Sequence, residues 1–228
     1  MEYLKSSLIR QIDAAAVQEL GIPGLLLMEN SARGVCDVLQ SQKPNGRILI
    51  ACGPGNNGGD GLAVARLLAA DGIQCEIYMI HAGKPLTADA ASNLDFLNRC
   101  RISVAEADSE SLQVAVLQLT AEDWFVDALL GTGIRGTLRS PYFEIVEAVN
   151  LSAARVLSID VPSGLDSDTG EPCGVAVRAD VTVTFVATKA GFRFENAFPY
   201  LGRVFVRHIG VPQKWLTAWY ARSMANSE

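Results

Sequence analysis

The sequence predicts one α/β domain over residues 1–228, built on a doubly wound, mostly parallel sheet with helices on both faces. Three observations lead to this prediction. Short apolar runs alternate with helical stretches of about ten residues, as in successive βα units. The apolar runs are continuous rather than alternating, which is typical of strands covered on both faces. No linker, repeat or low-complexity segment divides the chain, and its 49% of hydrophobic residues suffices for a sizeable core.

Two helices are expected before the sheet. Apolar residues recur with helical spacing over 6–20, where Ser7 is available as the capping residue. A Gly-Ile-Pro-Gly segment at 21–24 ends this helix, and a second helix is expected over 25–40. A Pro-Asn-Gly turn at 44–46 then leads into the first strand.

From residue 47 onward, strands and helices alternate, and the last third of the chain is richer in β-forming residues. The expected strands cover 47–52, 75–80, 102–107, 124–130, 155–161, 181–186 and 204–208. The expected helices between them cover 61–70, 87–98, 111–119 and 142–150, and a short helix-like tail carries Trp215 and Trp219.

Composition narrows the classes of function and location. A formal charge of −6 argues against broad binding to nucleic acid or to an anionic membrane, although a small anionic ligand can still bind locally. The five cysteines include no Cys-x-x-Cys pair, which disfavours a disulfide framework or a zinc ribbon and favours free thiols in a reducing compartment. No apolar run reaches the roughly 18 residues of a membrane span, and no export signal is evident. We therefore expect a cytoplasmic protein.

Four informative segments each follow a strand directly: 53–61, 131–136, 162–166 and 188–191. Open parallel sheets bind ligands outside the carboxyl ends of their strands, near the point where the strand order reverses. If the strands are parallel, these four segments meet at one edge of the sheet. That edge is where we expect the functional site.

The segment 53–61 reads GPGNNGGDG and contains a GxGxxG pattern, which suits close approach of the backbone to a phosphate. A standard dinucleotide fingerprint also needs an acidic residue near the end of the second strand, and 79–82 has none. A Walker A loop is excluded because no Gly-Lys-Ser/Thr follows. Asn56, Asn57 and Asp60 add side-chain oxygens and amides that a pure phosphate loop does not need. The alternative interpretation is a tight turn in which Asp60 caps the next helix.

Two aspartates follow or interrupt apolar strands. Asp127 lies within Trp-Phe-Val-Asp-Ala-Leu-Leu, where a carboxylate costs several kcal/mol unless a cation or hydrogen-bond donors meet it. It is therefore either a metal ligand or a carboxylate held by N–H groups of nearby loops or helices. Asp160 ends Val-Leu-Ser-Ile-Asp, closer to the mouth of its strand, where a ligand can reach it.

The remaining segments contribute backbone N–H groups, one guanidinium and one lysine. Backbone N–H groups of Gly131–Gly136 and the Arg135 guanidinium suit a phosphate or ribose, although an ordinary flexible turn is the alternative. Lys189 ends at the same edge; a lone surface lysine is the alternative there. Ser163 lies outside any GxSxG pattern, and neither histidine lies in these four segments, so a serine triad is disfavoured.

Five segments in register resemble one family. They are LLLMEN (25–30), GPGNNGGDG (53–61), VDALLGTGIRG (126–136), IDVPSGLDSDTG (159–170) and TFVATKAGF (184–192). Together they resemble the NAD(P)H-hydrate epimerases, a family that includes the apolipoprotein A-I-binding protein and the N-terminal domain of bifunctional NAD(P)H-hydrate repair enzymes. The resemblance runs in order over nearly the whole chain.

The resemblance implies a Rossmann-like fold and a nucleotide-binding isomerase of metabolite repair. Such enzymes interconvert the R and S epimers of hydrated NADH and NADPH, damaged cofactors with a hydroxyl at C6 of the nicotinamide ring. The functional partner is a dehydratase that acts on the S epimer and is fused to the epimerase in some relatives. The resemblance also implies a potassium ion and a homodimer.

Carried over residue by residue, the resemblance implies potassium ligands at Asn57, Asp127 and Ser163. The residues expected to contact the hydrate are Asn56, Asn57, Gly58, Gly59, Asp60, Gly131, Thr132, Gly133, Ile134, Arg135, Gly136, Thr137 and Asp160. Inversion at C6 is acid–base work, for which Asp160 is the expected base and acid. Lys189 is its expected partner, or the charge that keeps it ionised. The alternatives are a nucleotide-sensing or protein-binding module without catalysis, and an NAD-dependent dehydrogenase, which the missing acidic residue disfavours.

Overall fold

The computed structural model describes residues 3–225 and contains a seven-stranded sheet in which every neighbouring pair is parallel. The strand order is β4-β3-β2-β5-β6-β7-β9. The strands are β2 Ile48–Cys52, β3 Glu76–Met79, β4 Ala105–Glu106, β5 Trp124–Ala128, β6 Arg155–Ile159, β7 Val181–Phe185 and β9 Arg203–Arg207. The order reverses between β2 and β5, since the chain runs outward from β2 to one edge and from β5 to the other. The predicted doubly wound, parallel architecture is confirmed.

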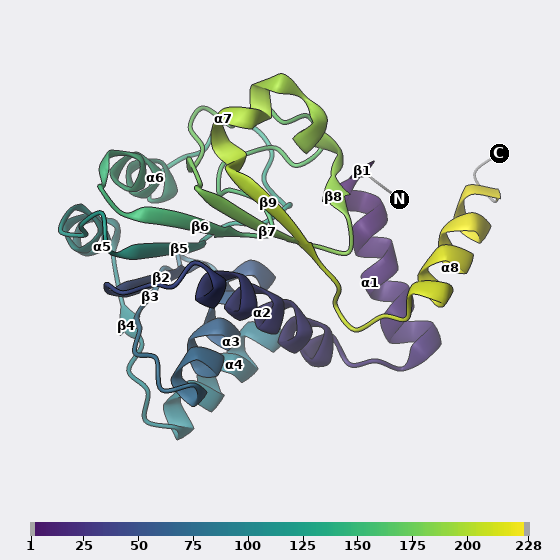
Figure 1. Cartoon of the computed structure of the whole chain (residues 1–228), viewed down its shortest axis with the longest axis horizontal. Coiled ribbons are helices and arrows are strands. Elements are labelled where there is room, and N and C mark those ends of the chain that lie inside the picture. Colours follow the sequence, from purple (N-terminus) through teal and green to yellow (C-terminus); the bar gives the residue numbers. More distant parts are fainter. Residues whose placement is uncertain (1–2, 226–228) are drawn as a thin grey trace.

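Helices cover both faces of this sheet, as predicted (Figure 1). One face packs against α2 Gly24–Ser41, α3 Asn56–Ala70 and α4 Ala88–Arg99, and the other against α5 Ser109–Leu117 and α6 Tyr142–Leu151. Successive residues of a strand point to opposite faces. In β2, Ile48 and Ile50 therefore join the first core, whereas Leu49 joins the second. Burial on both faces explains why the strands read as continuous apolar runs.

Two helices lie beyond the main layers. Helices α1 Ser6–Leu20 and α8 Gln213–Ala225 lie beside each other and share an apolar cluster that includes Ile12, Leu216 and Trp219 (Figure 1). A two-residue strand, β1 Tyr3–Leu4, pairs with β8 Thr188–Lys189 and attaches the start of α1 to the segment after β7. The short helices η1 Ala190–Arg193, η2 Glu195–Ala197 and α7 Phe198–Leu201 lie between β8 and β9. The sequence did not predict β1, β8 or these turns.

The start of α1 differs from the prediction. Ser7 lies inside the helix, and Lys5 at the N-cap position makes no side-chain capping bond. Instead, Asp168 Oδ1 accepts hydrogen bonds from the Ser6 backbone N–H and from the Ser6 hydroxyl, both at 2.7 Å. A carboxylate at this position accepts a hydrogen bond from a backbone N–H that has no partner within the helix, and it is stabilised by the positive end of the helix dipole. The cap comes from a residue far along the chain, so local sequence does not reveal it.

Helix α3 begins at Asn56, five residues earlier than predicted. Most of the glycine-rich segment forms the first turns of this helix. Glycine is required there because neighbouring atoms leave no room for a Cβ, and not because the backbone needs to be flexible. A Cβ at Gly58 would lie 1.7 Å from the Gly53 carbonyl oxygen, and one at Gly61 would lie 2.5 Å from the Ala128 Cβ. Close packing against β2 and β5 outweighs the low helix propensity of glycine. The interpretation of Asp60 as a helix cap is wrong, since Asp60 lies inside the helix.

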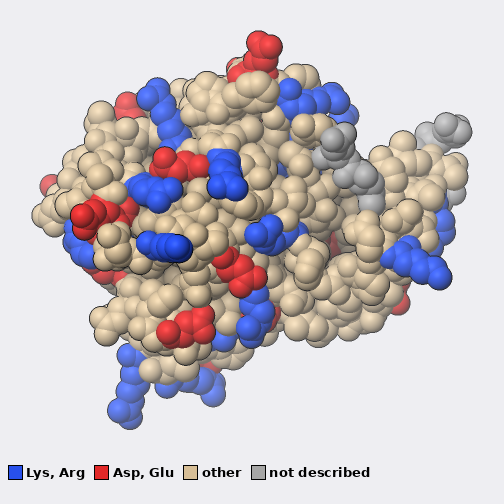
Figure 2. All heavy atoms as spheres, viewed as in Figure 1, with Lys and Arg blue, Asp and Glu red and all other residues tan. Residues whose placement is uncertain are grey.

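The face of the molecule in Figure 2 carries Lys and Arg side chains interspersed with Asp and Glu, without a large area of one sign. All five cysteines are free thiols. Within residues 3–225, no helix is both long and apolar enough to cross a membrane.

Candidate active site

A cavity of about 1150 Å³ opens at the carboxyl ends of the central strands. Its walls are the start of α3, the segment 129–142 after β5, Asp160 after β6, Lys189 in β8, and one side of α1. The cavity lies beside the β2/β5 position where the strand order reverses, which is the ligand site expected of this architecture. Three of the four predicted strand-end segments, 53–61, 131–136 and 188–191, contribute residues to this cavity, whereas 162–166 does not line it and Asp160 just before that segment does.

Most of the predicted substrate contacts line this cavity. Those that do so are Asn56, Asn57, Asp60, Gly131, Thr132, Gly133, Ile134, Arg135, Gly136, Thr137 and Asp160. Gly58 and Gly59 are fully packed within the fold: a Cβ on Gly59 would lie 2.7 Å from the Met28 Cε. The structure therefore places these two glycines against neighbouring backbone and side chains rather than against the cavity.

Asp160 and Lys189 form an ion pair at the inner end of the cavity, with 2.5 Å between Lys189 Nζ and Asp160 Oδ1. The Lys189 side chain is 1% exposed and also donates to the Phe185 carbonyl oxygen at 3.3 Å. The interpretation of Lys189 as a surface lysine is therefore wrong. The Thr184 hydroxyl donates to Asp160 Oδ1 at 3.2 Å. Asp160 has a positive φ of 64°, a conformation that is strained for most residues but adopted by Asp more readily than by most.

Asp127 is fully buried behind the cavity, and four donors meet its carboxylate. Oδ2 accepts from the Ser158 hydroxyl and the Ser163 N–H, both at 2.8 Å. Oδ1 accepts from the Ser163 hydroxyl at 2.5 Å and the Leu129 N–H at 3.3 Å. Burial raises the pKa of Asp127 overall, although these hydrogen bonds oppose the change. The alternative of a carboxylate held by nearby donors is therefore what the structure contains, and no cation is needed to explain its burial.

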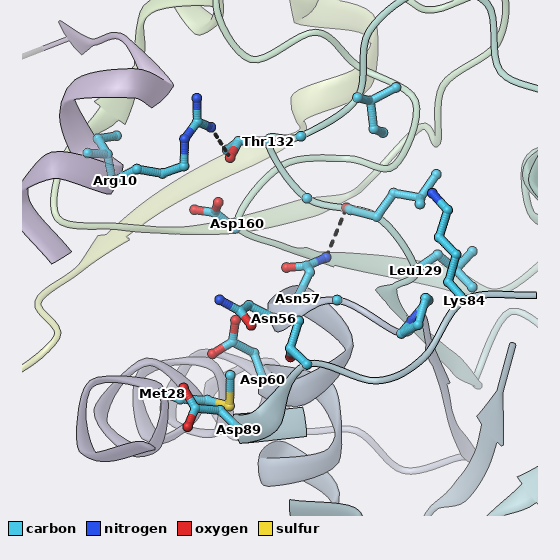
Figure 3. Close-up of a pocket in the computed structure, with 18 of the residues that line it drawn as sticks. Arg10, Met28, Asn56, Asn57, Asp60, Lys84, Asp89, Leu129, Thr132 and Asp160 are labelled. Carbon is cyan, nitrogen blue, oxygen red and sulfur yellow. Dashed lines mark hydrogen bonds between the residues drawn. The ribbon is translucent and has the colours of Figure 1, made fainter. Parts of the chain in front are cut away.

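Asn57 lines the cavity with a buried side-chain amide. Its side chain is 7% exposed and its Nδ2 donates to the Leu130 carbonyl oxygen at 3.0 Å, whereas its Oδ1 has no hydrogen-bond partner among the described residues (Figure 3). Across residues 3–225, no three His, Cys, Asp or Glu side chains converge as a metal cluster. Amide, hydroxyl and carboxylate oxygens are hard ligands that suit an s-block cation. Of the three expected ligands, Asn57 Oδ1 is available to such a cation, whereas the Asp127 carboxylate accepts four hydrogen bonds, one of them from the Ser163 hydroxyl.

Sequence reasoning missed the contribution of α1. Arg10 reaches into the cavity and donates to the Thr132 hydroxyl at 3.2 Å (Figure 3). Asp13, one turn further along, also lines the cavity. Burial, followed by the charge of Asp160, raises the pKa of Asp13 to about 6. The available signal was a carboxylate inside the apolar stretch from Ile12 to Val17.

The two ends of the cavity differ in chemistry. Figure 3 shows Asp160, Asn57 and Asp60 facing a common space at the inner end. Burial, with the charges of Asp160 and Asp13, raises the pKa of Asp60 well above its ordinary value. Along the outer wall, Arg135 pairs with Asp166 and Asp168 at 3.3 and 3.2 Å. The arrangement offers acid–base groups at one end and backbone or guanidinium donors beside it.

Comparison with known proteins identifies the family of this chain. Residues 24–191 match the family described as YjeF-related protein N-terminus. An NAD(P)H-hydrate epimerase of Rhodopirellula baltica is 40% identical over 91% of this chain and 84% of its own length. One from Pirellula staleyi is 40% identical over 91% of this chain and 92% of its own. The bifunctional NAD(P)H-hydrate repair enzyme Nnr of Salinibacter ruber is 38% identical over 92% of this chain and 41% of its own length.

The fold has a solved counterpart. The crystal structure of the yeast protein YNL200c superposes with a TM-score of 0.81 and covers 96% of this chain and 93% of its own, at 23% sequence identity. It supports the architecture alone. Taken with the family match and the epimerase relatives, these comparisons show that the chain belongs to the YjeF-related N-terminal family, among the NAD(P)H-hydrate epimerases.

Proposed function

We propose that this protein is an isomerase that interconverts the R and S epimers of hydrated NADH and NADPH. The observation that carries the proposal is the Asp160–Lys189 ion pair, held at the inner end of a nucleotide-sized cavity at the switch in strand order. The epimerase relatives, which match this chain over most of their length, support the same reaction.

The chemistry needs one base and one acid. C6 of the hydrate bears both a hydroxyl and the ring nitrogen, so its inversion requires one of these bonds to break and to re-form on the other face. A proton leaves one atom as another atom gains one, which is general acid–base catalysis. Asp160 is the proposed base, since the Lys189 ammonium stabilises its charged form. Asp160 returns the proton when the bond re-forms.

The rest of the nucleotide is proposed to lie along the outer part of the cavity. The N-terminus of α3 at Asn56 and the backbone of Gly131–Gly136 supply N–H groups, and anions are stabilised at helix N-termini. Arg135 adds a guanidinium that suits a phosphate. Asn56, Asn57, Asp60 and Asp160 then surround the damaged ring.

Potassium is the proposed cation of this site, with Asn57, Asp127 and Ser163 as its ligands. Its chemistry would be a fixed positive charge that orients these oxygens and favours an anionic nucleotide nearby. Asn57 Oδ1, which has no hydrogen-bond partner within residues 3–225, supports this assignment.

The proposed functional partner is a dehydratase that consumes the S epimer. Relatives named bifunctional repair enzymes support this pairing, because this chain matches only 41% of the length of two of them. We further propose that residues 1–228 form one epimerase domain, that the protein is a homodimer and that it acts in the cytoplasm. Size-exclusion chromatography with light scattering tests the homodimer.

The decisive experiment is chiral chromatography of R-NADPH hydrate incubated with the purified protein and potassium. We expect conversion to the equilibrium mixture faster than in buffer or with boiled protein. Asp160→Asn should lower the rate about 100-fold or more, because it removes the base. Asp95→Asn is the matched control, since Asp95 lies on the exposed side of α4 and pairs with Arg99. Tight nucleotide binding without acceleration would indicate a binding module instead.

A further inference from the structure

Asp13 is an acid that the proposed reaction has not yet used. It lies on α1, which packs Ile9 and Ile12 into the apolar cluster shared with α8, and it lines the same cavity as Asp160. A carboxylate in such a place costs free energy unless it is paired or protonated. Its position on the cavity wall therefore calls for a functional explanation.

The charged groups around Asp13 come from four other positions. Asp160 follows β6, Lys189 lies in β8, Asp60 lies in α3, and Arg10 lies one turn earlier in α1. Asp89 of α4 lines the same cavity, and its charge also raises the pKa of Asp60. Lys189 is the buried cation at this end, and its ammonium lies against Asp160. Like charges in a poorly solvated space disfavour one another's ionisation, so the protonated forms of Asp13 and Asp60 are favoured.

Two further observations support this picture. The pKa of Asp13 is raised to about 6, first by burial and then by the charge of Asp160, so its acid form is available near neutral pH. Burial and neighbouring charges also raise the pKa of Asp60 well above its ordinary value. Independently, the buried Asn57 Oδ1 without a partner among the described residues indicates that a ligand completes this end of the cavity.

We propose that Asp13 is a second catalytic residue, which donates a proton to the ring nitrogen of the hydrate while Asp160 removes the proton of the C6 hydroxyl. This inference rests on the proposed function of the preceding section. It assigns the two halves of acid–base catalysis to two carboxyls that lie far apart in the sequence.

The step balances without another reactant. Asp160 takes the hydroxyl proton as the C6–O bond becomes a carbonyl and the C6–N1 bond breaks. The electron pair of that bond remains on N1, which gains the proton of Asp13. The open-chain aldehyde turns about its C5–C6 bond and presents its other face to N1. Ring closure returns the N1 proton to Asp13 and the Asp160 proton to the C6 oxygen, which yields the other epimer.

The test compares Asp13→Asn, Asp13→Glu and Glu19→Gln in the full chain. Glu19 is the matched control because it is a carboxylate of the same helix that pairs with Arg222 at the surface. Initial rates of epimerisation by chiral chromatography give kcat and KM from pH 5 to 9, corrected for the spontaneous reaction. Circular dichroism confirms that each variant is folded.

We expect Asp13→Asn to lower kcat about 100-fold or more with little change in KM, because a transition-state proton donor is lost. The wild-type rate should fall as the pH rises above about 6, where Asp13 loses its proton, and this fall should disappear in the Asp13→Asn variant. Asp13→Glu should recover part of kcat and restore the fall. Glu19→Gln should match the wild type.

Two results would overturn the assignment while leaving the proposed function intact. One is a folded Asp13→Asn variant with wild-type kcat, or with a lower kcat and an unchanged pH profile, which a structural role would give. The other is incorporation of one oxygen-18 from labelled water into C6 at every inversion, which means that the C–O bond breaks. A wild-type protein that does not accelerate epimerisation at all would instead refute the proposed function.

Discussion

The buried ionisable residues of this molecule are accommodated in different ways. Asp127 is met by four hydrogen-bond donors, and Lys189 by the carboxylate of Asp160. Asp13 and Asp60 have raised pKa values, because burial and neighbouring negative charge favour their neutral forms. The hydrogen bonds of Asp127 and the ion pair of Lys189 offset part of the cost of burying a charge, whereas Asp13 and Asp60 carry that cost in the folded state. Costs of this kind are typical of residues kept for chemistry.

The cost at Asp13 predicts a stabilising substitution. The pKa of Asp13 rises from its ordinary value of 3.8 to about 6 on folding, so the folded state binds the proton more tightly than the unfolded state. Its ionisation therefore reduces stability as the pH rises from about 4 to about 6, and the loss persists above that range. We expect Asp13→Asn to be more stable than the wild type at pH 7 by on the order of 1–3 kcal/mol.

Urea denaturation at several pH values checks this prediction. The advantage of Asp13→Asn should shrink as the pH falls below about 6 and vanish near pH 4. Glu19→Gln on the same helix should show no such dependence. A destabilised Asp13→Asn variant at pH 7 would contradict the prediction, since it would mean that the carboxylate is favourably paired.

At the scale of elements, α1 is the least expected part of the site. Its amphipathic pattern alone predicts a helix packed on apolar neighbours, and Ile9 and Ile12 do pack in this way. Its position, however, depends on β1 pairing with β8 and on Asp168 holding its N-terminus. These long-range attachments place Arg10 and Asp13 against the cavity. The helix is therefore a wall of the site rather than an appendage.

The hydrogen bonds between Asp168 and Ser6 predict which substitution destabilises the position of α1 against the cavity. Asp168→Ala removes the acceptor for Ser6 and the partner of Arg135, so it should cost about 1 kcal/mol of stability and raise KM. Asp168→Asn keeps an oxygen for Ser6 and should retain most of the stability, while it weakens the pairing with Arg135. Urea denaturation and epimerisation kinetics separate the two effects. Equal stability losses in both variants would argue against the capping role.

At the scale of the whole molecule, the site exists because the strand order reverses between β2 and β5. The segments after these strands diverge to opposite faces, which leaves a crevice at their carboxyl ends. Asn57 and Leu130 face each other across that junction and are joined by a hydrogen bond of 3.0 Å. A cation bound to Asn57, Asp127 and Ser163 would therefore connect three separate segments of the fold.

This position predicts a potassium-dependent stability. An ion that binds the folded state adds RT ln(1 + [K⁺]/Kd), about 2.7 kcal/mol at 100 times Kd, which corresponds to a Tm increase of several degrees for a chain of this size. Scanning calorimetry in potassium should show this increase relative to choline at equal ionic strength. Asn57→Ala should abolish it, whereas the exposed Asn98→Ala should not. An equal increase in Asn57→Ala would place the ion elsewhere.

The sequence by itself determined the parallel sheet, its coverage by helices on both faces and the edge of the sheet at which the candidate site lies. Continuous apolar strands, helical spacing and glycine-rich segments after strands are local patterns, so they remain visible without a structure. Even so, helix α3 began at Asn56 rather than at residue 61, because the need for close packing at Gly58 and Gly61 is a tertiary constraint.

Only the tertiary structure decided what surrounds each functional group. Local sequence leaves Lys189 open between a functional cation and a surface lysine, and the structure buries it in β8, which pairs with β1. Local sequence leaves Asp127 open between a metal ligand and a carboxylate held by nearby donors, and the structure contains four such donors. Asp13 and the cap at Asp168 depend on contacts between the start of the chain and residues far along it. Burial and pairing are properties of such contacts, and they determine charge states that the order of residues does not encode locally.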